Sequence, residues 1–338
     1  MSGFVSVGDL SRSAYLRQAN AALKLRLSEL TQEAASGMKS DIPRATNGNL
    51  GRLAQVEDRL ARLTAHGRNG ALALSELDGL QGALGAIGDL ATLRAGELVT
   101  APGLMDEATL NLRSRQAGQD FQAVVRLMNV DVGGRFVLSG TAVQTPPLDD
   151  PAAILQQVEA QVAGLTSPGD IIAALDAWFN APAGGGGFID AHYGGNADPV
   201  VTSVSPESTV THALTAVDPA FRGILAGMAI AAIAGNPDLA LSRDDKASLM
   251  AAAGTRIGAG NDALTSERSR VGMNQQQVEQ AVARNGAART ALSIARSDIL
   301  AADPYDTASA LTQTEANLQN LYALTSRLSR LSLADYLR

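Results

Sequence analysis

Residues that could perform chemistry gather in the middle of the chain, beside the glycine run 184–187. Asp190, His192, Tyr193 and Asp198 follow this run. An Asp-x-His pair can orient an imidazole for general-base catalysis, and a glycine loop can bind phosphate. The run lacks the lysine and Ser/Thr of a P-loop and the strand–helix pattern of a dinucleotide site. We therefore interpret the segment as an exposed loop with a polar tip, and we predict no catalytic residues.

Four aromatic side chains, Trp178, Phe179, Phe188 and Tyr193, lie close together in the same part of the sequence. Arranged around a cleft, they would suit a binding site for a ligand such as a glycan. Packed against one another, they would form the core of a small domain. We favour the core, and a glycan-binding or enzymatic central domain stays an alternative.

The composition argues against metal, redox and nucleic-acid functions. The 338 residues include no cysteine and three histidines, which excludes thiolate metal sites and leaves little for an imidazole site. His66 and His212 have no partners at ligand spacing, so we expect them at the surface or fully hydrogen-bonded. The net charge is −7 and the basic residues are scattered, unlike in a protein that binds a phosphate backbone. We predict no metal, no cofactor and no enzymatic activity.

No segment has the pattern of a membrane span or a cleaved leader. The longest apolar run, residues 223–235, is thirteen residues and too short to cross a bilayer, so it predicts a buried helix. The N-terminus lacks the basic and apolar regions of a signal peptide.

Proline after a capping residue marks four predicted helix starts. They are Asp150-Pro151, Ser167-Pro168, Asp218-Pro219 and Asp303-Pro304. The first side chain accepts hydrogen bonds from the first turn, where proline fits because it has no N–H. Ser242 and Asp245 resemble a capping box ahead of a long helix. A hairpin is expected near 133–142, with a strand at 135–139, and residues 181–212 predict a mixture of short helices and strands.

Apolar residues recur every seven positions toward both ends of the chain, a spacing typical of coiled coils. The terminal seams contain Leu16, Leu23, Leu27 and Leu30, and then Leu311, Leu318, Leu321, Leu328 and Leu331. Longer inner seams run over 56–98 and 257–299, and a shorter one over 110–128. Asn285 interrupts an inner seam and would fix helix register at some cost in stability.

The inner seams can cover one another within one molecule, whereas the short terminal seams are suited to polymerisation. We predict an assembly interface of the terminal seam residues together with Leu333, Tyr336 and Leu337. The predicted fold is mainly α, with a long coiled-coil or helical-bundle rod and a small α+β domain inserted in the middle. The domains would be terminal helices at 1–45 and 303–338, a rod at 46–142 and 243–302, and an insertion at 143–242.

Glycines at every third position disturb the second seam. They are Gly79, Gly82, Gly85 and Gly88. Each costs about 1 kcal/mol in a helix relative to alanine. Either the helix is segmented there, or another backbone approaches it closely.

The terminal segments resemble the flagellin superfamily. The stretch 23–43, LKLRLSELTQEAASGMKSDIP, is similar to the family's first helix and the Ser-Gly spoke after it, and 297–337 is similar to its C-terminal region. Within the superfamily, the ending Ser332–Leu337 and the segment 136–141 followed by Pro146-Pro147 resemble the hook-filament junction proteins (hook-associated protein 3). The Ala-x-Asp-Asp-Ala signature of flagellins is absent, and residues 44–47 read Arg-Ala-Thr-Asn.

The resemblance, which covers roughly 5–142 and 243–337, implies a non-enzymatic flagellar adaptor that forms a ring. Its partners would be hook-associated protein 1, flagellin and a flagellar export chaperone. Its location would be extracellular, at the hook-filament junction, after type III export without a cleaved signal peptide. A divergent flagellin is the structural alternative.

Overall fold

The computed structural model describes residues 7–46 and 48–336. The fold is mainly α, as predicted, and the described residues contain two antiparallel sheets of two strands each. The chain divides into two compact units, one of Met1–Thr64 with Ala287–Arg338 and one of Ala65–Gly286. The long helices α3 (Gly51–Val99) and α9 (Arg243–Leu300) contribute to both units. The finer division into terminal, rod and inserted domains stays a prediction.

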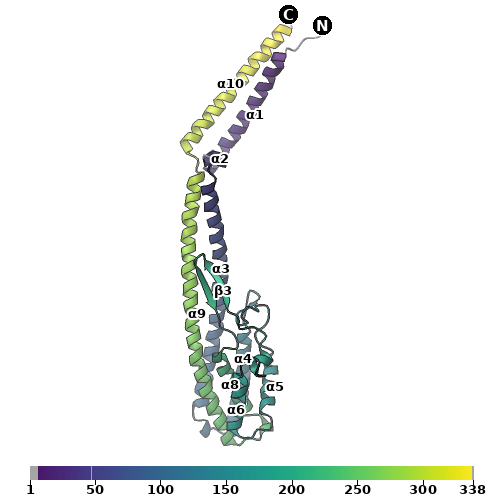
Figure 1. Cartoon of the computed structure of the whole chain (residues 1–338), viewed down its shortest axis with the longest axis vertical. Coiled ribbons are helices and arrows are strands. Elements are labelled where there is room, and N and C mark those ends of the chain that lie inside the picture. Colours follow the sequence, from purple (N-terminus) through teal and green to yellow (C-terminus); the bar gives the residue numbers. More distant parts are fainter. Residues whose placement is uncertain (1–6, 47, 337–338) are drawn as a thin grey trace. The chain divides into compact units, whose positions relative to one another are not determined.

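The first unit contains a pair of antiparallel helices, α1 (Val7–Ser36) and α10 (Pro304–Tyr336). Figure 1 shows that α1 begins, and α10 ends, at the same end of this pair. The helix α1 ends at Ser36, because Gly37 adopts a left-handed conformation (φ 68°), and the short α2 (Ile42–Ala45) follows.

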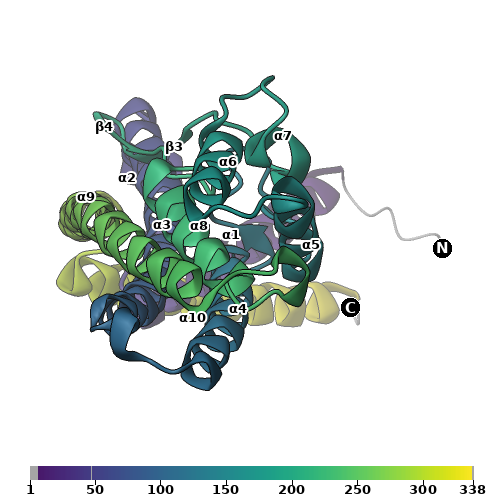
Figure 2. The same ribbon diagram turned by 90° about the horizontal axis from the view of Figure 1, so that it is seen from below.

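The second unit surrounds one buried helix with several shorter elements. In chain order these are η1 (Pro102–Leu104), α4 (Glu107–Met128), β1 (Asp131–Val132), β2 (Arg135–Phe136), α5 (Pro151–Val162), α6 (Pro168–Asn180), α7 (Phe188–His192), β3 (Val200–Ser205), β4 (Ser208–His212), α8 (Pro219–Ile233) and η2 (Pro237–Leu239). Figure 2 shows α8 at the centre, with α4, α6 and α9 around it. The apolar run at 223–235 is therefore a buried helix, as predicted. No described helix is long and apolar enough to cross a membrane.

The four predicted helix starts are confirmed. Asp150, Asp218 and Asp303 each accept a hydrogen bond from a backbone N–H of the first turn, at 2.8–3.0 Å. Ser167 begins α6 without a side-chain bond. The Ser242 N–H donates to Asp245 Oδ2 (3.1 Å) and the Asp245 N–H to Ser242 Oγ (3.2 Å), which is the reciprocal pattern of a capping box.

The glycine-rich stretch of α3 does not segment the helix, which is continuous over 51–99. A Cβ on Gly79 would lie 2.5 Å from Val132 Cγ2, so a side chain of the β1–β2 hairpin requires that glycine. A Cβ on Gly82 would meet nothing within 4 Å. Of the two alternatives, segmentation is excluded, and close approach holds at Gly79, where a side chain approaches and not a backbone.

Backbones do approach closely where α8 crosses α9. A Cβ on Gly260 would lie 2.8 Å from the Ile224 nitrogen, and one on Gly227 would lie 2.9 Å from the Ala253 carbonyl oxygen. Helices meet at this distance only when the crossing point lacks side chains. These glycines therefore set the position of α8 against α9.

Asn285, the polar residue of the inner seam, has a partner that the sequence did not indicate. It is buried, and its Nδ2 donates to the carbonyl oxygen of Val204 in β3 at 2.7 Å. The β3–β4 hairpin lies along α3 and α9 at this level (Figure 1). The predicted strand at 135–139 is shorter in the structure, where β2 covers Arg135–Phe136.

We expect Gly260→Ala to lower the free energy of unfolding of the second unit by about 1–3 kcal/mol, because the new methyl group forces α8 away from α9. Urea unfolding followed by the fluorescence of Trp178 measures this, since the chain has one tryptophan. Gly258→Ala is the matched control, because a Cβ there meets nothing within 4 Å, and it should stabilise the helix by up to about 1 kcal/mol. Equal effects at both positions would contradict the close crossing.

Candidate assembly interface

The predicted seam residues of α1 and α10 line the contact between these two helices. Leu30 is buried, with 2% of its surface exposed. Seven further leucines are half-buried: Leu16, Leu23 and Leu27 on α1, and Leu311, Leu318, Leu321 and Leu328 on α10. Two helices alone cover each seam from one side, which explains the partial burial. The side chains of Leu331, Leu333 and Tyr336 are not described, and Leu337 lies outside the described residues.

A short backbone pairing closes the base of the helix pair. Met38 and Ala301 form an antiparallel bridge. The Lys39 N–H donates to the Leu300 carbonyl at 2.8 Å, and the Ala302 N–H donates to the Gly37 carbonyl at 2.9 Å. These bonds fix the register of α1 against α10, so each heptad position has a defined opposite.

Polar groups are buried in the same seam. Glu33, Thr307 and Thr314 are buried, and Glu33 Oε1 accepts a hydrogen bond from the Ser40 N–H at 2.9 Å. Beside them lies a cavity of about 380 Å³. Charged side chains, among them Arg26, Glu33 and Asp306, contribute to its lining. This end of the seam is therefore more polar than the part formed by the leucines.

Apolar side chains outside the seam are also exposed on α1 and α10, which the heptad analysis missed. Leu25 on α1 is 67% exposed, and Tyr15, Tyr322 and Leu324 are also exposed. Exposed alanines accompany them, namely Ala14, Ala21, Ala22, Ala35, Ala316 and Ala323. Tyr322 and Leu324 are two positions apart and therefore lie on different sides of α10, so the helix pair has apolar surface on more than one side. We call Leu25, Tyr15, Tyr322 and Leu324 the exposed apolar residues of the helix pair.

The residues with catalytic potential do not form a catalytic arrangement. Asp190 accepts hydrogen bonds from the N–H groups of Gly184 (2.8 Å) and Gly186 (2.6 Å), and these bonds lower the pKa of its carboxyl group. His192 pairs with Asp149 instead, with 3.0 Å between Nδ1 and Oδ2. Asp190 therefore closes the glycine loop and does not orient an imidazole.

The aromatic cluster is a core and not a cleft. Phe179 and Phe188 are fully buried, and Trp178 is buried against both, with ring centroids 4.8 and 5.6 Å away. Tyr193 is half-buried and donates from its hydroxyl to the Asn196 carbonyl at 2.7 Å. The favoured interpretation of these four side chains is the one that the structure supports. The described residues also hold no group of three or more side chains that could bind a metal.

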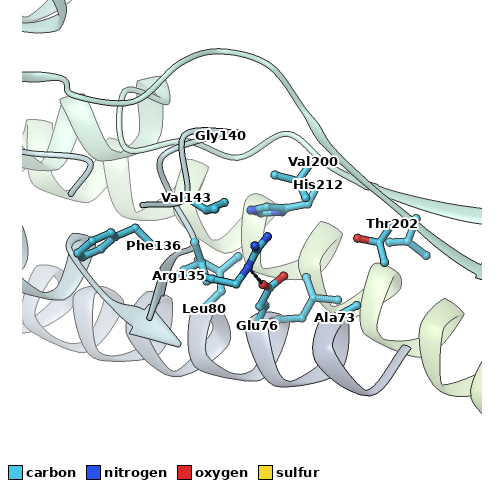
Figure 3. A pocket seen from close by; sticks show the side chains of 13 residues that line it. Ala73, Glu76, Leu80, Arg135, Phe136, Gly140, Val143, Val200, Thr202 and His212 are labelled. Atoms are coloured by element: carbon cyan, nitrogen blue, oxygen red, sulfur yellow. Dashed lines mark hydrogen bonds and ion pairs between the residues drawn. The ribbon is translucent and has the colours of Figure 1, made fainter. Parts of the chain in front are cut away.

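A small pocket in the second unit contains an arrangement of ionisable groups that the sequence did not anticipate. It lies between α3, the segment after β2 and the β3–β4 hairpin (Figure 3). Arg135 Nε donates to Glu76 Oε1 at 2.6 Å. His212 faces the same pocket, and its Nε2 is buried without a hydrogen-bond partner. His212 was expected at the surface or fully hydrogen-bonded, and this expectation was wrong. The imidazole of His66 has a contact, because its Nδ1 lies 3.4 Å from the Ser203 carbonyl oxygen.

Residues 255–337, which span most of α9 and α10, match the family model described as the bacterial flagellin C-terminal helical region. This part of the chain is flagellin-like. The flagellin-like segment contains every α10 residue of the predicted interface, and it includes the stretch 297–337 on which the C-terminal resemblance depends. The resemblance of 23–43 stays a prediction.

One solved structure similar to this chain comes from Vibrio parahaemolyticus and is provisionally assigned as a flagellar hook-associated protein. The identity is 15% and the TM-score 0.41, over 81% of this chain and 96% of the other. None of the curated proteins matches the chain.

Leu30→Ala should loosen the α1–α10 pair, because removing a buried leucine side chain costs about 2–5 kcal/mol. Hydrogen exchange of the α10 amides in the full chain should become faster. Leu25→Ala is the matched control on the same helix, and its effect should stay within about 0.5 kcal/mol because that side chain is exposed. Unchanged protection of α10 in Leu30→Ala would show that the seam does not hold the pair.

Proposed function

We propose that this chain is a structural, non-enzymatic component of the bacterial flagellum that assembles through α1 and α10. The observation that carries the proposal is the set of exposed apolar residues of the helix pair, half of which lie in the flagellin-like segment. A helix pair that buries one seam internally and exposes further apolar side chains has surface left for neighbouring subunits. Assembly would bury both the half-covered seam and these exposed residues.

Within the flagellum, we propose that the chain joins hook-associated protein 1 to the flagellin filament. The ending Ser332–Leu337 and the segment 136–141 support the junction role by their resemblance to junction proteins. An adaptor between two different polymers needs two different faces, so its contacts are heterologous. Export through the flagellar type III apparatus, with a chaperone on the terminal helices, and an extracellular location belong to the same proposal.

A divergent flagellin is the second candidate, and the match of residues 255–337 to a flagellin family model favours it. The two candidates differ in where the chain lies. A junction protein occupies one band, whereas a flagellin occupies the whole filament.

Immunogold labelling of purified flagella with antibody against residues 143–242 separates the two candidates. We expect a single labelled band where hook meets filament. Label along the whole filament would identify a flagellin, and flagella without label would contradict a flagellar role.

Leu25→Glu and Leu324→Glu, made together, should leave the helix content of the purified chain unchanged, because both side chains are exposed. In cells they should reduce incorporation about tenfold or more, which corresponds to losing about 1.4 kcal/mol of contact free energy. The measurement is the amount of the variant in purified flagella, relative to the wild type. Leu112→Glu, on α4, is the control because its side chain is also exposed but lies outside the terminal helices. Normal incorporation of the double variant would exclude Leu25 and Leu324 as contacts.

A further inference from the structure

The β3–β4 hairpin (200–212) is fastened to two helices by side-chain hydrogen bonds to its backbone carbonyls. From α3, Asn69 Nδ2 donates to the Ser203 carbonyl at 3.2 Å. From α9, Asn274 Nδ2 donates to the Thr211 carbonyl at 3.2 Å and Asn285 Nδ2 to the Val204 carbonyl at 2.7 Å. An isolated two-stranded hairpin is marginally stable in water. The hairpin therefore depends on its attachment to α3 and α9.

The inner face of the hairpin carries valines together with Thr202, which lines the pocket beneath it. Val204 and Val210 are buried. His212, the last residue of β4, enters the pocket shown in Figure 3, which has a volume of about 40 Å³. A hydrogen bond with the backbone of Val137 holds the ring, and Nε2 has no partner. A neutral imidazole with Nε2 as an unused acceptor fits this arrangement.

The charged groups around this imidazole form a pair of their own. Besides His212, the pocket lining has two ionisable side chains, Glu76 from α3 and Arg135 from β2. They are bonded to each other, and in Figure 3 the guanidinium group points toward the imidazole. The side chains of α9 that bind the hairpin are uncharged amides. A proton on Nε2 would therefore place a largely desolvated cation without a hydrogen-bond partner next to Arg135, and the Glu76 carboxylate, which already binds Arg135, offsets only part of that cost.

We propose that the β3–β4 hairpin is a pH-sensitive latch on α3 and α9, which protonation of His212 releases. In the docked state, burial disfavours the imidazolium ion. In the released state, water solvates it. Acid therefore favours release, and this inference does not depend on the flagellar role.

Proton linkage gives the direction and the pH range. Burial lowers the pKa of His212 below its usual value of 6.5, against the smaller opposing effects of the Val137 backbone and the Glu76 carboxylate. The released hairpin therefore binds more protons than the docked one as the pH falls below 6.5. Docking is fully favoured above this pH, and each unit by which burial lowers the pKa allows up to about tenfold more release in acid.

Hydrogen exchange of the full chain at pH 7.5, 6.5 and 5.5 tests the proposal. After correction for the pH dependence of chemical exchange, amides of residues 200–212 should exchange severalfold faster at pH 5.5 than at pH 7.5. His212→Phe, which keeps a ring but cannot take a proton, should abolish this change. A wild-type hairpin whose corrected exchange does not change with pH would overturn the proposal.

His66 requires its own control, because its imidazole also contacts the hairpin, at the Ser203 carbonyl. His66→Gln should keep the pH response. A response that disappears in His66→Gln and persists in His212→Phe would overturn the proposal.

A third variant serves if the phenylalanine ring prevents docking at every pH. Glu76→Gln removes the carboxylate that favours the imidazolium ion in the docked state, so the docked pKa of His212 falls further and acid should release the hairpin more extensively than in the wild type. An acid response of Glu76→Gln that is smaller than that of the wild type would refute the role of His212.

Discussion

The structure depends on apolar stripes with a seven-residue period, each of which must be covered by a stripe that comes from the other half of the chain. In the second unit, Leu84 and Ala91 on α3 and Leu264 and Val271 on α9 are buried. The pairing is antiparallel, with Gln81 of α3 donating to the Arg268 carbonyl of α9 at 2.8 Å. In the first unit, α1 and α10 repeat this arrangement. Each unit therefore needs both an early and a late segment of the chain.

The inner pair is not self-sufficient over its whole length. At Gly70 of α3, a Cβ would lie 2.6 Å from Val282 of α9, so the two helices are close there. Asn285, which follows on α9, hydrogen-bonds to the hairpin and not to α3. A polar residue on a coiled-coil seam usually selects register or partner. Here Asn285 binds the β3–β4 hairpin, which lies between α3 and α9 in the sequence. The seam of α9 therefore holds the hairpin as well as α3.

Local signals in the sequence predicted what local chemistry controls. Proline after a capping residue marked the starts of α5, α6, α8 and α10, and sevenfold spacing marked the long helices. The sequence did not predict contacts between distant segments, because nothing near His212 in the chain indicates Arg135 or Glu76. The glycine pattern shows the same limit. Gly79 and Gly82 are alike in sequence, yet a side chain approaches Gly79 alone of the two.

The sequence predicted one part of the candidate interface, the seam leucines, and missed the exposed apolar residues. The heptad period identified the leucines between α1 and α10, since a helix period is a local property. The exposed apolar residues of the helix pair have no such period: Leu25 and Tyr15 on α1 become notable only when the structure shows that the partner helix leaves them uncovered. An exposed side chain is defined by what does not cover it, and a sequence alone does not contain that information.

The backbone pairing of Lys39 with Leu300 has a consequence for the order of folding. Its two residues are separated by the entire second unit, so forming it closes a very long loop and carries the corresponding entropy cost. During synthesis, α1 emerges first, but its partner helix α10 is the last helix to be completed. The second unit can reach its native contacts earlier, because all its segments precede α10. The terminal pair is thus the last part of the chain to form, and a nascent or unfolded chain presents α1 alone for as long as the rest takes to arrive.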